Sequence, residues 1–177
     1  MMRNKFVCGY RVAVILAASI LIFSGNAWAV EQSLSFAVGG VIDKIMVKSG
    51  DAVRAGAPLA RLDSRPLRAR KQVADARENL ANEFFKRAEE NLSRVKQLYD
   101  DLATSGEELE KAQTELAKAK AEKEIAKAKV DLAAWRLEQT TLKAPSNGTV
   151  TQVPGYRGLV VHPRAGNYPV VLFQVND

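Results

Sequence analysis

The sequence predicts an α+β fold in which a helical hairpin is inserted into one small β domain and splits it into two halves. Two observations support this prediction. Two short stretches resemble each other, because Gly40 and Gly148 are 108 positions apart and so are Gly50 and Gly158. Between them lies a long, charged, alanine-rich segment with helical periodicity. Each stretch is too short to bury a core alone, so we expect the two halves to close on each other.

The first 29 residues have the layout of a secretory signal peptide. A positively charged start precedes an apolar run over residues 12–23, and Ala27 and Ala29 offer small side chains before a cut at Val30. The apolar run is shorter than the roughly 20 residues that a membrane-spanning helix needs. We expect residues 1–29 to direct export. An uncleaved anchor in the inner membrane is the alternative.

Composition narrows the classes of function. Cleavage would remove Cys8, the only cysteine, so the mature chain would form neither a disulfide nor a thiolate site. It would also reduce the number of Lys and Arg residues from 26 to 23, while Asp and Glu stay at 20, so the formal charge would fall from +6 to +3. The remaining basic residues alternate with Asp and Glu along the helical segment, which is typical of a solvated surface. We therefore expect no nucleic-acid partner.

The first β half is predicted over residues 30–64. The stretch from Val41 to Val47 mixes β-branched residues with charged ones, Gly50 lies in a turn signal, and Leu59 and Leu62 mark a further strand. These short strands predict half of a small barrel or sandwich.

The inserted hairpin is predicted over residues 65–140. Asp63 or Ser64 can cap the first helix, and Pro66 falls in the first turn, where its missing N–H costs little. Apolar residues then recur at spacings of three and four and predict one stripe facing the second helix. They are Val73, Ala76, Leu80, Phe84, Ala88, Leu92, Val95, Leu98 and Leu102.

The second arm carries a regular heptad seam. Its positions are Leu109, Ala112, Leu116, Ala119, Lys123, Ala126, Val130, Ala133 and Leu137. The alanines at every second seam position would let two antiparallel helices approach closely. Ile125, Leu132 and Trp135 lie off the seam. Two explanations stay open: these residues contact other copies or the β domain, or they are scattered apolar residues on the surface. Each arm of about 35 to 39 residues would extend roughly 50 to 58 Å.

The turn between the arms is predicted near residues 103–106. Ser105 followed three residues later by Glu108 predicts a capping box, in which the hydroxyl accepts from the Glu108 N–H and the Glu108 carboxylate accepts from the Ser105 N–H. The second β half, residues 141–177, then repeats the strand and turn pattern of the first, with Ala144 to Gly148 as its first turn. The chain thus returns to the β domain.

No catalytic, metal or cofactor site is predicted. His162 is the only histidine, and without cysteine ligands it makes neither a metal site nor a nucleophile pair. The glycines lie singly in turns and form no phosphate-binding loop. We therefore expect a protein that is not an enzyme and that takes its energy from a partner.

The two half-motifs, residues 40–63 and 142–150, resemble those of the lipoyl-like, barrel-sandwich hybrid domain in periplasmic adaptor subunits of the HlyD type, also called membrane fusion proteins. The resemblance covers the chain from about Ser33 to Asp177. It implies a lipoyl-like domain with an inserted hairpin and a periplasmic location. It also implies that the protein bridges an inner-membrane transporter and a TolC-type outer-membrane channel for efflux or secretion. We also expect copies of the chain to associate, because so small a β domain buries a limited fraction of its surface and is marginally stable alone.

The resemblance also implies a partner-binding site. In the tripartite efflux branch of this family, the hairpin tip carries an Arg, a Leu four residues on and a Ser seven beyond that, and these engage the channel. Arg94, Leu98 and Ser105 stand at those spacings. Each also has a structural explanation: a solvated charge, a member of the stripe and a helix cap.

Family members usually continue into a β-barrel domain that contacts the transporter. The sequence stops at Asp177, so we expect this chain to lack that domain and to use the lipoyl-like unit or another adaptor instead. Two alternatives stay open: a periplasmic coiled-coil spacer or chaperone without a transport role, and a lipoyl or biotinyl carrier domain. A carrier needs a lysine on a tight turn between the halves. Here two long helices occupy that connection, and Lys48 lies within the first half.

Overall fold

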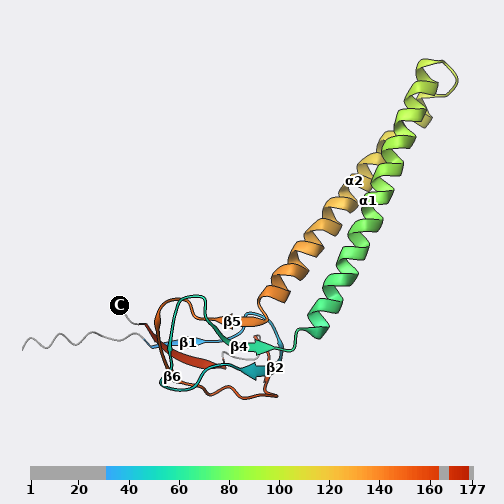
Figure 1. The fold of residues 1–177 in the computed structure, drawn as a ribbon. Helices are drawn as coiled ribbons and strands as arrows, with labels where there is room; N and C mark the ends of the chain where they lie inside the picture. Colours follow the sequence, from blue (N-terminus) through green and yellow to red (C-terminus); the bar gives the residue numbers. More distant parts are fainter. Residues whose placement is uncertain (1–30, 164–167, 176–177) are drawn as a thin grey trace, which may run out of the picture. The chain divides into compact units, whose positions relative to one another are not determined.

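The computed structural model describes residues 31–163 and 168–175. The predicted signal peptide lies outside the described residues. The elements follow the order predicted for a split β domain with an inserted hairpin (Figure 1). They are β1 (Glu31–Leu34), β2 (Gly40–Ile45), β3 (Ala52–Val53), β4 (Pro58–Leu62), α1 (Arg65–Asp100), α2 (Gly106–Glu138), β5 (Thr141–Lys143), β6 (Gly148–Gln152), β7 (Val160–Val161) and β8 (Val171–Val175).

The strands form two four-stranded antiparallel sheets. Their strand orders are β1-β8-β6-β3 and β5-β4-β2-β7, so each sheet takes two strands from each half of the chain. Exchanging β1–β4 with β5–β8 turns one order into the other. The repeat detected in the sequence is therefore a two-fold relation between the sheets.

Equivalent backbone atoms of the two repeats bond across this two-fold relation. The Gly50 N–H donates to the Val150 carbonyl at 2.7 Å, and the Gly158 N–H donates to the Ile42 carbonyl at 2.8 Å. Both glycines have a φ of +91°, in the left-handed region that disfavours side chains. Each half thus completes the hydrogen bonding of the other, and the expectation of mutual closure is confirmed.

The core lies between the two sheets and is contributed by both halves. Ile42, Leu59 and Leu62 from the first half meet Val150 and Phe173 from the second, and all five side chains are fully buried. Since neither half holds enough of these residues to form a core alone, the domain folds as one unit.

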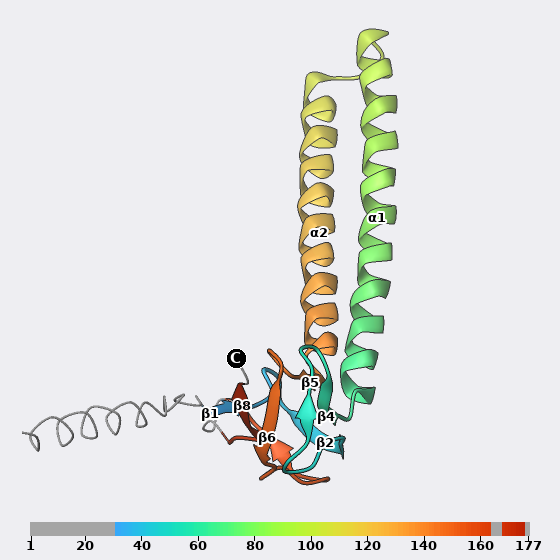
Figure 2. The same ribbon diagram turned by 60° about the vertical axis from the view of Figure 1, so that its left-hand side comes forward.

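Helices α1 and α2 have 36 and 33 residues and lie side by side as an antiparallel pair (Figure 2). The predicted seam of α2 is confirmed, because all its members are buried or half-buried. Ala112, Ala119 and Ala126 are the buried ones. Neither α1 nor α2 is apolar enough over its length to cross a bilayer, and the same holds for every helix in the described part of the chain.

The predicted stripe of α1 is wrong in the half of the helix nearer the β domain. Val73, Leu80 and Phe84 are exposed, and the residues after them face α2 instead. The observed seam consists of Leu67, Lys71, Ala74, Glu78, Ala81, Phe85, Ala88, Leu92 and Val95. The predicted stripe and the observed seam coincide at Ala88, Leu92 and Val95. Opposite the alanine-rich face of α2, Ala74 and Ala81 lie inside, and their larger neighbours Val73 and Leu80 lie outside.

This register also explains the lysine in the seam of α2. The Lys123 ammonium lies 4.5 Å from the centroid of the Phe85 ring, within the range of a cation–π interaction. The half-buried lysine thereby covers the ring that the shifted register turns inward.

The start of α1 is capped by the first of the two predicted residues. The Asp63 carboxylate accepts from the Arg65 N–H at 3.0 Å, whereas the Ser64 side chain makes no cap bond. The Arg65 guanidinium also donates to this carboxylate at 2.7 Å. These hydrogen bonds lower the pKa of Asp63 to about 2, since they favour its charged form.

Candidate partner-binding site at the hairpin tip

The end of α1 is closed by a Schellman motif. The Leu102 N–H donates to the Tyr99 carbonyl at 3.0 Å, and the Ala103 N–H donates to the Leu98 carbonyl at 2.8 Å. This pattern requires a left-handed residue between helix and turn, and Leu102 holds that place with a φ of +56°. Glycine is the usual residue here, because a side chain costs about 1 kcal/mol in this conformation.

Burial does not offset the strain at Leu102. The residue is 92% exposed, the largest exposure among the large apolar residues of the described chain. The stripe predicted from the sequence placed it against α2, and this prediction is wrong because the helix ends before it. A leucine that is both strained and in water is a candidate contact for a partner. The spacing of apolar residues gave no signal for it, because the pattern continues past the end of α1.

The start of α2 lies next to this motif. The Ser105 hydroxyl accepts from the Glu108 N–H at 3.3 Å, which confirms this half of the predicted capping box. The described hydrogen bonds include none from the Ser105 N–H to the Glu108 carboxylate. Glu107 and Glu108 lie in the first turn, where the positive end of the helix dipole favours carboxylates. As the acceptor in this cap, the hydroxyl keeps its own O–H for a partner.

Arg94 and Leu98 lie one helical turn apart on α1. The Arg94 guanidinium donates to the Asn91 side-chain oxygen at 2.7 Å and is exposed. Leu98 is 42% exposed, so it belongs to the surface. The prediction that placed it in the stripe facing α2 is wrong. The spacing of four places these two side chains on one face. Ser105 stands across the turn, and the described contacts do not join it to either residue. The tip therefore offers two leucines, one guanidinium and one hydroxyl donor.

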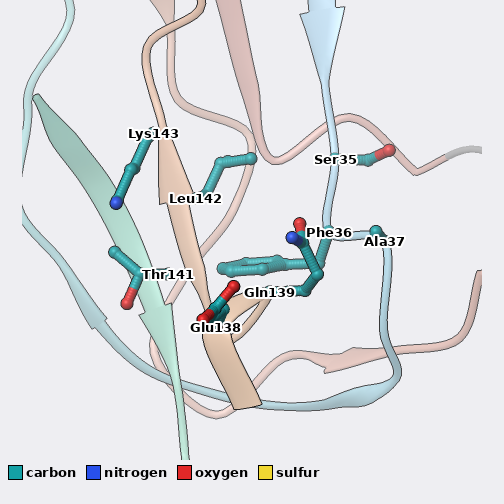
Figure 3. Close-up of a pocket in the computed structure, with 8 residues that line it drawn as sticks. All are labelled: Ser35, Phe36, Ala37, Glu138, Gln139, Thr141, Leu142 and Lys143. Carbon is teal, nitrogen blue, oxygen red and sulfur yellow. The ribbon is translucent and has the colours of Figure 1, made fainter. Parts of the chain in front are cut away.

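A second candidate lies where the hairpin joins the β domain. A cavity of about 490 Å³ is lined by the segment after β1 and by the junction of α2 with β5. Figure 3 shows the buried ring of Phe36 in this cavity, with the side chains of Glu138 and Gln139 beside it. Across the described residues, no group of His, Cys, Asp and Glu is arranged to hold a metal ion. Nothing in this cavity indicates a ligand, whereas the tip displays strained and exposed groups.

Comparisons with known proteins bear on the fold. No protein-family model and no curated protein sequence matches the chain. Among solved structures, a MacA–MexA chimera containing the Pseudomonas aeruginosa MexA α-hairpin domain is 27% identical, with a TM-score of 0.58 over 82% of this chain and 48% of the chimera. ZneB from Cupriavidus metallidurans is 19% identical, with a TM-score of 0.59 over 81% of this chain and 60% of ZneB.

The membrane fusion protein Spr0693 from Streptococcus pneumoniae R6 is also similar. It is 20% identical, with a TM-score of 0.50 over 84% of this chain and 64% of Spr0693. The chain thus spans less than two thirds of the length of each of these three structures. The described residues have the fold of the membrane fusion proteins, as the resemblance in sequence predicted.

Proposed function

We propose that this protein is a periplasmic adaptor that links an inner-membrane transporter to a TolC-type outer-membrane channel for efflux or secretion, and that its hairpin tip docks on the channel. The fold shared with membrane fusion proteins supports the adaptor role. The observation that carries the docking site is Leu102, which is exposed and strained at the turn of the hairpin. Burial of this leucine in a partner would offset the strain.

The hairpin suits a mechanical link. At 1.5 Å per residue, the 36 residues of α1 span roughly 54 Å, so one end can hold a partner while the β domain holds another. At the tip, Leu98 and Leu102 would enter an apolar pocket of the channel. Arg94 and Ser105 would donate hydrogen bonds to its carbonyl or carboxylate groups. Energy for transport would come from the inner-membrane partner.

We further propose that copies associate side by side through their β domains. Val41 of β2 and Val160 of β7 are register partners, and both side chains are exposed. Strand β7 is an edge strand of its sheet, so this apolar pair lies where a neighbouring copy can cover it. A ring of copies would align their hairpins and present several tips to one channel.

The test is co-purification of the exported protein with an outer-membrane channel. Arg94→Asp should abolish channel association while helicity and export stay unchanged. Arg87→Asp is the matched control, since it makes the same charge change on the same helix two turns farther from the tip, and it should keep the channel bound. Photo-crosslinking from position 98 in cells should capture the channel. Normal recovery of the channel by Arg94→Asp would contradict the docking site.

A further inference from the structure

A groove with an apolar floor and a basic rim lies between α1 and α2, in the half of the hairpin nearer the β domain. Its volume is about 400 Å³. The floor consists of Ala69, Val73, Ala74, Leu132 and Ala133. The rim consists of Arg70, Arg77, Lys129 and Arg136. No acidic residue lines this groove, although Asp and Glu make up 20 residues of the chain.

The four rim cations have no ion pair among the described residues. Their helical neighbours three and four positions away include no Asp or Glu, so the usual pairing along a helix is absent. Lys71 shows the contrast, since its ammonium lies 2.8 Å from the Asp75 carboxylate. The rim therefore keeps its positive charge for a group outside the hairpin.

The apolar floor continues along the hairpin beyond the groove. Leu80 lies seven residues after Val73, and Ile125 lies seven before Leu132, so the four side chains share one face. Each is about half exposed. With Phe84, four residues after Leu80, the apolar surface runs roughly 22 Å from Ala69 along α1. An apolar stripe of this length on a charged helix pair marks an interaction surface.

We infer that this face binds an acidic amphipathic helix of another protein. The alanines of the floor let a third helix approach closely, and its apolar residues at helical spacing would pack between Val73 and Leu132 and between Leu80 and Ile125. Its Asp and Glu side chains would pair with the four rim cations. The inference goes beyond the proposed docking at the tip, because Val73 and Leu98 are 25 residues apart on one helix, or roughly 38 Å.

A second copy of this chain fits the face poorly. Two copies related by a two-fold axis would bring two sets of four Lys and Arg together without an acid between them. In a side-by-side ring, the neighbour would present its opposite flank. Below the tip, the described large apolar residues exposed on the helices are Val73, Leu80, Phe84, Ile125, Leu132 and Trp135. All except Trp135 lie on the basic face, so the opposite flank offers no matching apolar stripe.

The experiment is a charge exchange with the full exported chain and two synthetic helical peptides. Both peptides carry the same leucine stripe, flanked by Glu in one and by Lys in the other, and binding is measured by fluorescence anisotropy. The wild type should bind the Glu peptide and not the Lys peptide. The double variant Arg77→Glu, Lys129→Glu should lose at least tenfold in affinity for the Glu peptide and gain affinity for the Lys peptide. Leu132→Ser should weaken binding of the Glu peptide, although it leaves the charge of the groove unchanged.

Two controls separate this inference from the proposed function. Lys120→Glu, on the opposite flank, should leave peptide affinity unchanged. Arg94→Asp should also leave it unchanged, although that variant is expected to lose the channel. Circular dichroism of the double variant checks that the hairpin still folds. Equal affinity for both peptides, no binding of either, or no exchange of preference in the double variant would overturn the inference.

The natural occupant is tested by photo-crosslinking from position 80 in cells. We expect the captured segment to be an acidic helix of another protein, and we expect the double charge variant to lose it. Capture of this chain itself, together with dissociation of an oligomer by the same variant in sedimentation experiments, would assign the face to a second copy and overturn the inference.

Discussion

The β domain and the hairpin use their apolar residues in opposite ways. In the β domain, large apolar side chains form a closed core, and Leu59, Val150 and Phe173 are completely shielded from water. In the hairpin, the buried positions are mostly alanines, whereas large residues such as Leu80 and Ile125 lie outside. The β domain therefore closes on itself, whereas the hairpin leaves much of its apolar surface in water.

The difference also predicts where substitutions are tolerated. The β domain depends on close contact between two chain segments, so an added atom has no room where those segments meet. The hairpin depends on a narrow alanine seam, so it tolerates change everywhere except in that seam and at its turn. Four predictions test this contrast.

The largest effect is expected for Gly148→Ala in β6. A Cβ at this position would collide with the Gln174 carbonyl oxygen and the Phe173 ring, both in the neighbouring strand β8. We expect a loss of more than about 4 kcal/mol in the free energy of unfolding, measured by urea denaturation. Gly50→Ala is the control: its φ of +91° is strained but its Cβ meets no atom, so about 1 kcal/mol should be lost. Equal losses would contradict the collision.

A smaller loss is expected for Ala119→Leu in the seam of α2. Ala119 is buried against α1, and three added carbons would force the helices apart at a cost of about 1 to 3 kcal/mol. The melting temperature followed by helical circular dichroism should fall. Ala121→Leu, at an exposed position of the same helix, should leave it nearly unchanged. An unchanged melting curve for Ala119→Leu would refute the close packing of the seam.

Leu102→Gly at the tip is expected to raise the stability of the hairpin instead of lowering it. Glycine adopts the φ of +56° without strain, so the substitution should stabilise the hairpin by about 1 kcal/mol. It should also weaken channel association, because the exposed side chain is lost. Leu102→Ala keeps the strain and removes most of the side chain, so it should weaken association without stabilising. A Leu102→Gly variant that is no more stable than the wild type would contradict the strain.

The smallest effect concerns Asp63 at the start of α1. Its pKa is lowered to about 2 in the folded protein from an ordinary value near 3.8, so its contribution to stability is complete above pH 4 and is lost as the pH falls towards 2. Asp63→Asn should lower the melting temperature slightly at neutral pH, and the difference from the wild type should vanish near pH 2. Glu90→Gln, an exposed carboxylate in the middle of α1, is the control. A pH-independent difference would contradict the ion pair as its cause.

Several features of this protein could be predicted from local sequence. The glycine spacing of 108 predicted the repeat, because two pairs of glycines at the same offset indicate a repeated turn. The seam of α2 was predictable because its alternating alanines leave one possible apolar face. The cap at Ser105 was predictable because it depends on a contact three residues away. Such features need only neighbouring residues or a regular period.

The candidate site at the tip was predicted only in part. Arg94 and Leu98 lie in the last turns of α1 and Ser105 caps α2, and their binding role stays a prediction. Leu102 was missed as a candidate because the spacing of apolar residues continues past the point where α1 ends, and a periodic pattern contains no signal for the end of a helix. The exposed leucine became visible only through its φ and its position in the Schellman motif.

The sequence by itself determined the split β domain, the two helices and the face of α2 that meets α1. The tertiary structure alone decided the face of α1, because Val73-Ala74, Leu80-Ala81 and Phe84-Phe85 each place two apolar residues in succession, and periodicity cannot choose between them. The observed choice places Ala74 and Ala81 opposite the alanine-bearing seam of α2, where small side chains let the helices approach closely, and it turns Phe85 towards Lys123. The same choice leaves Val73 and Leu80 on the surface and creates the basic groove.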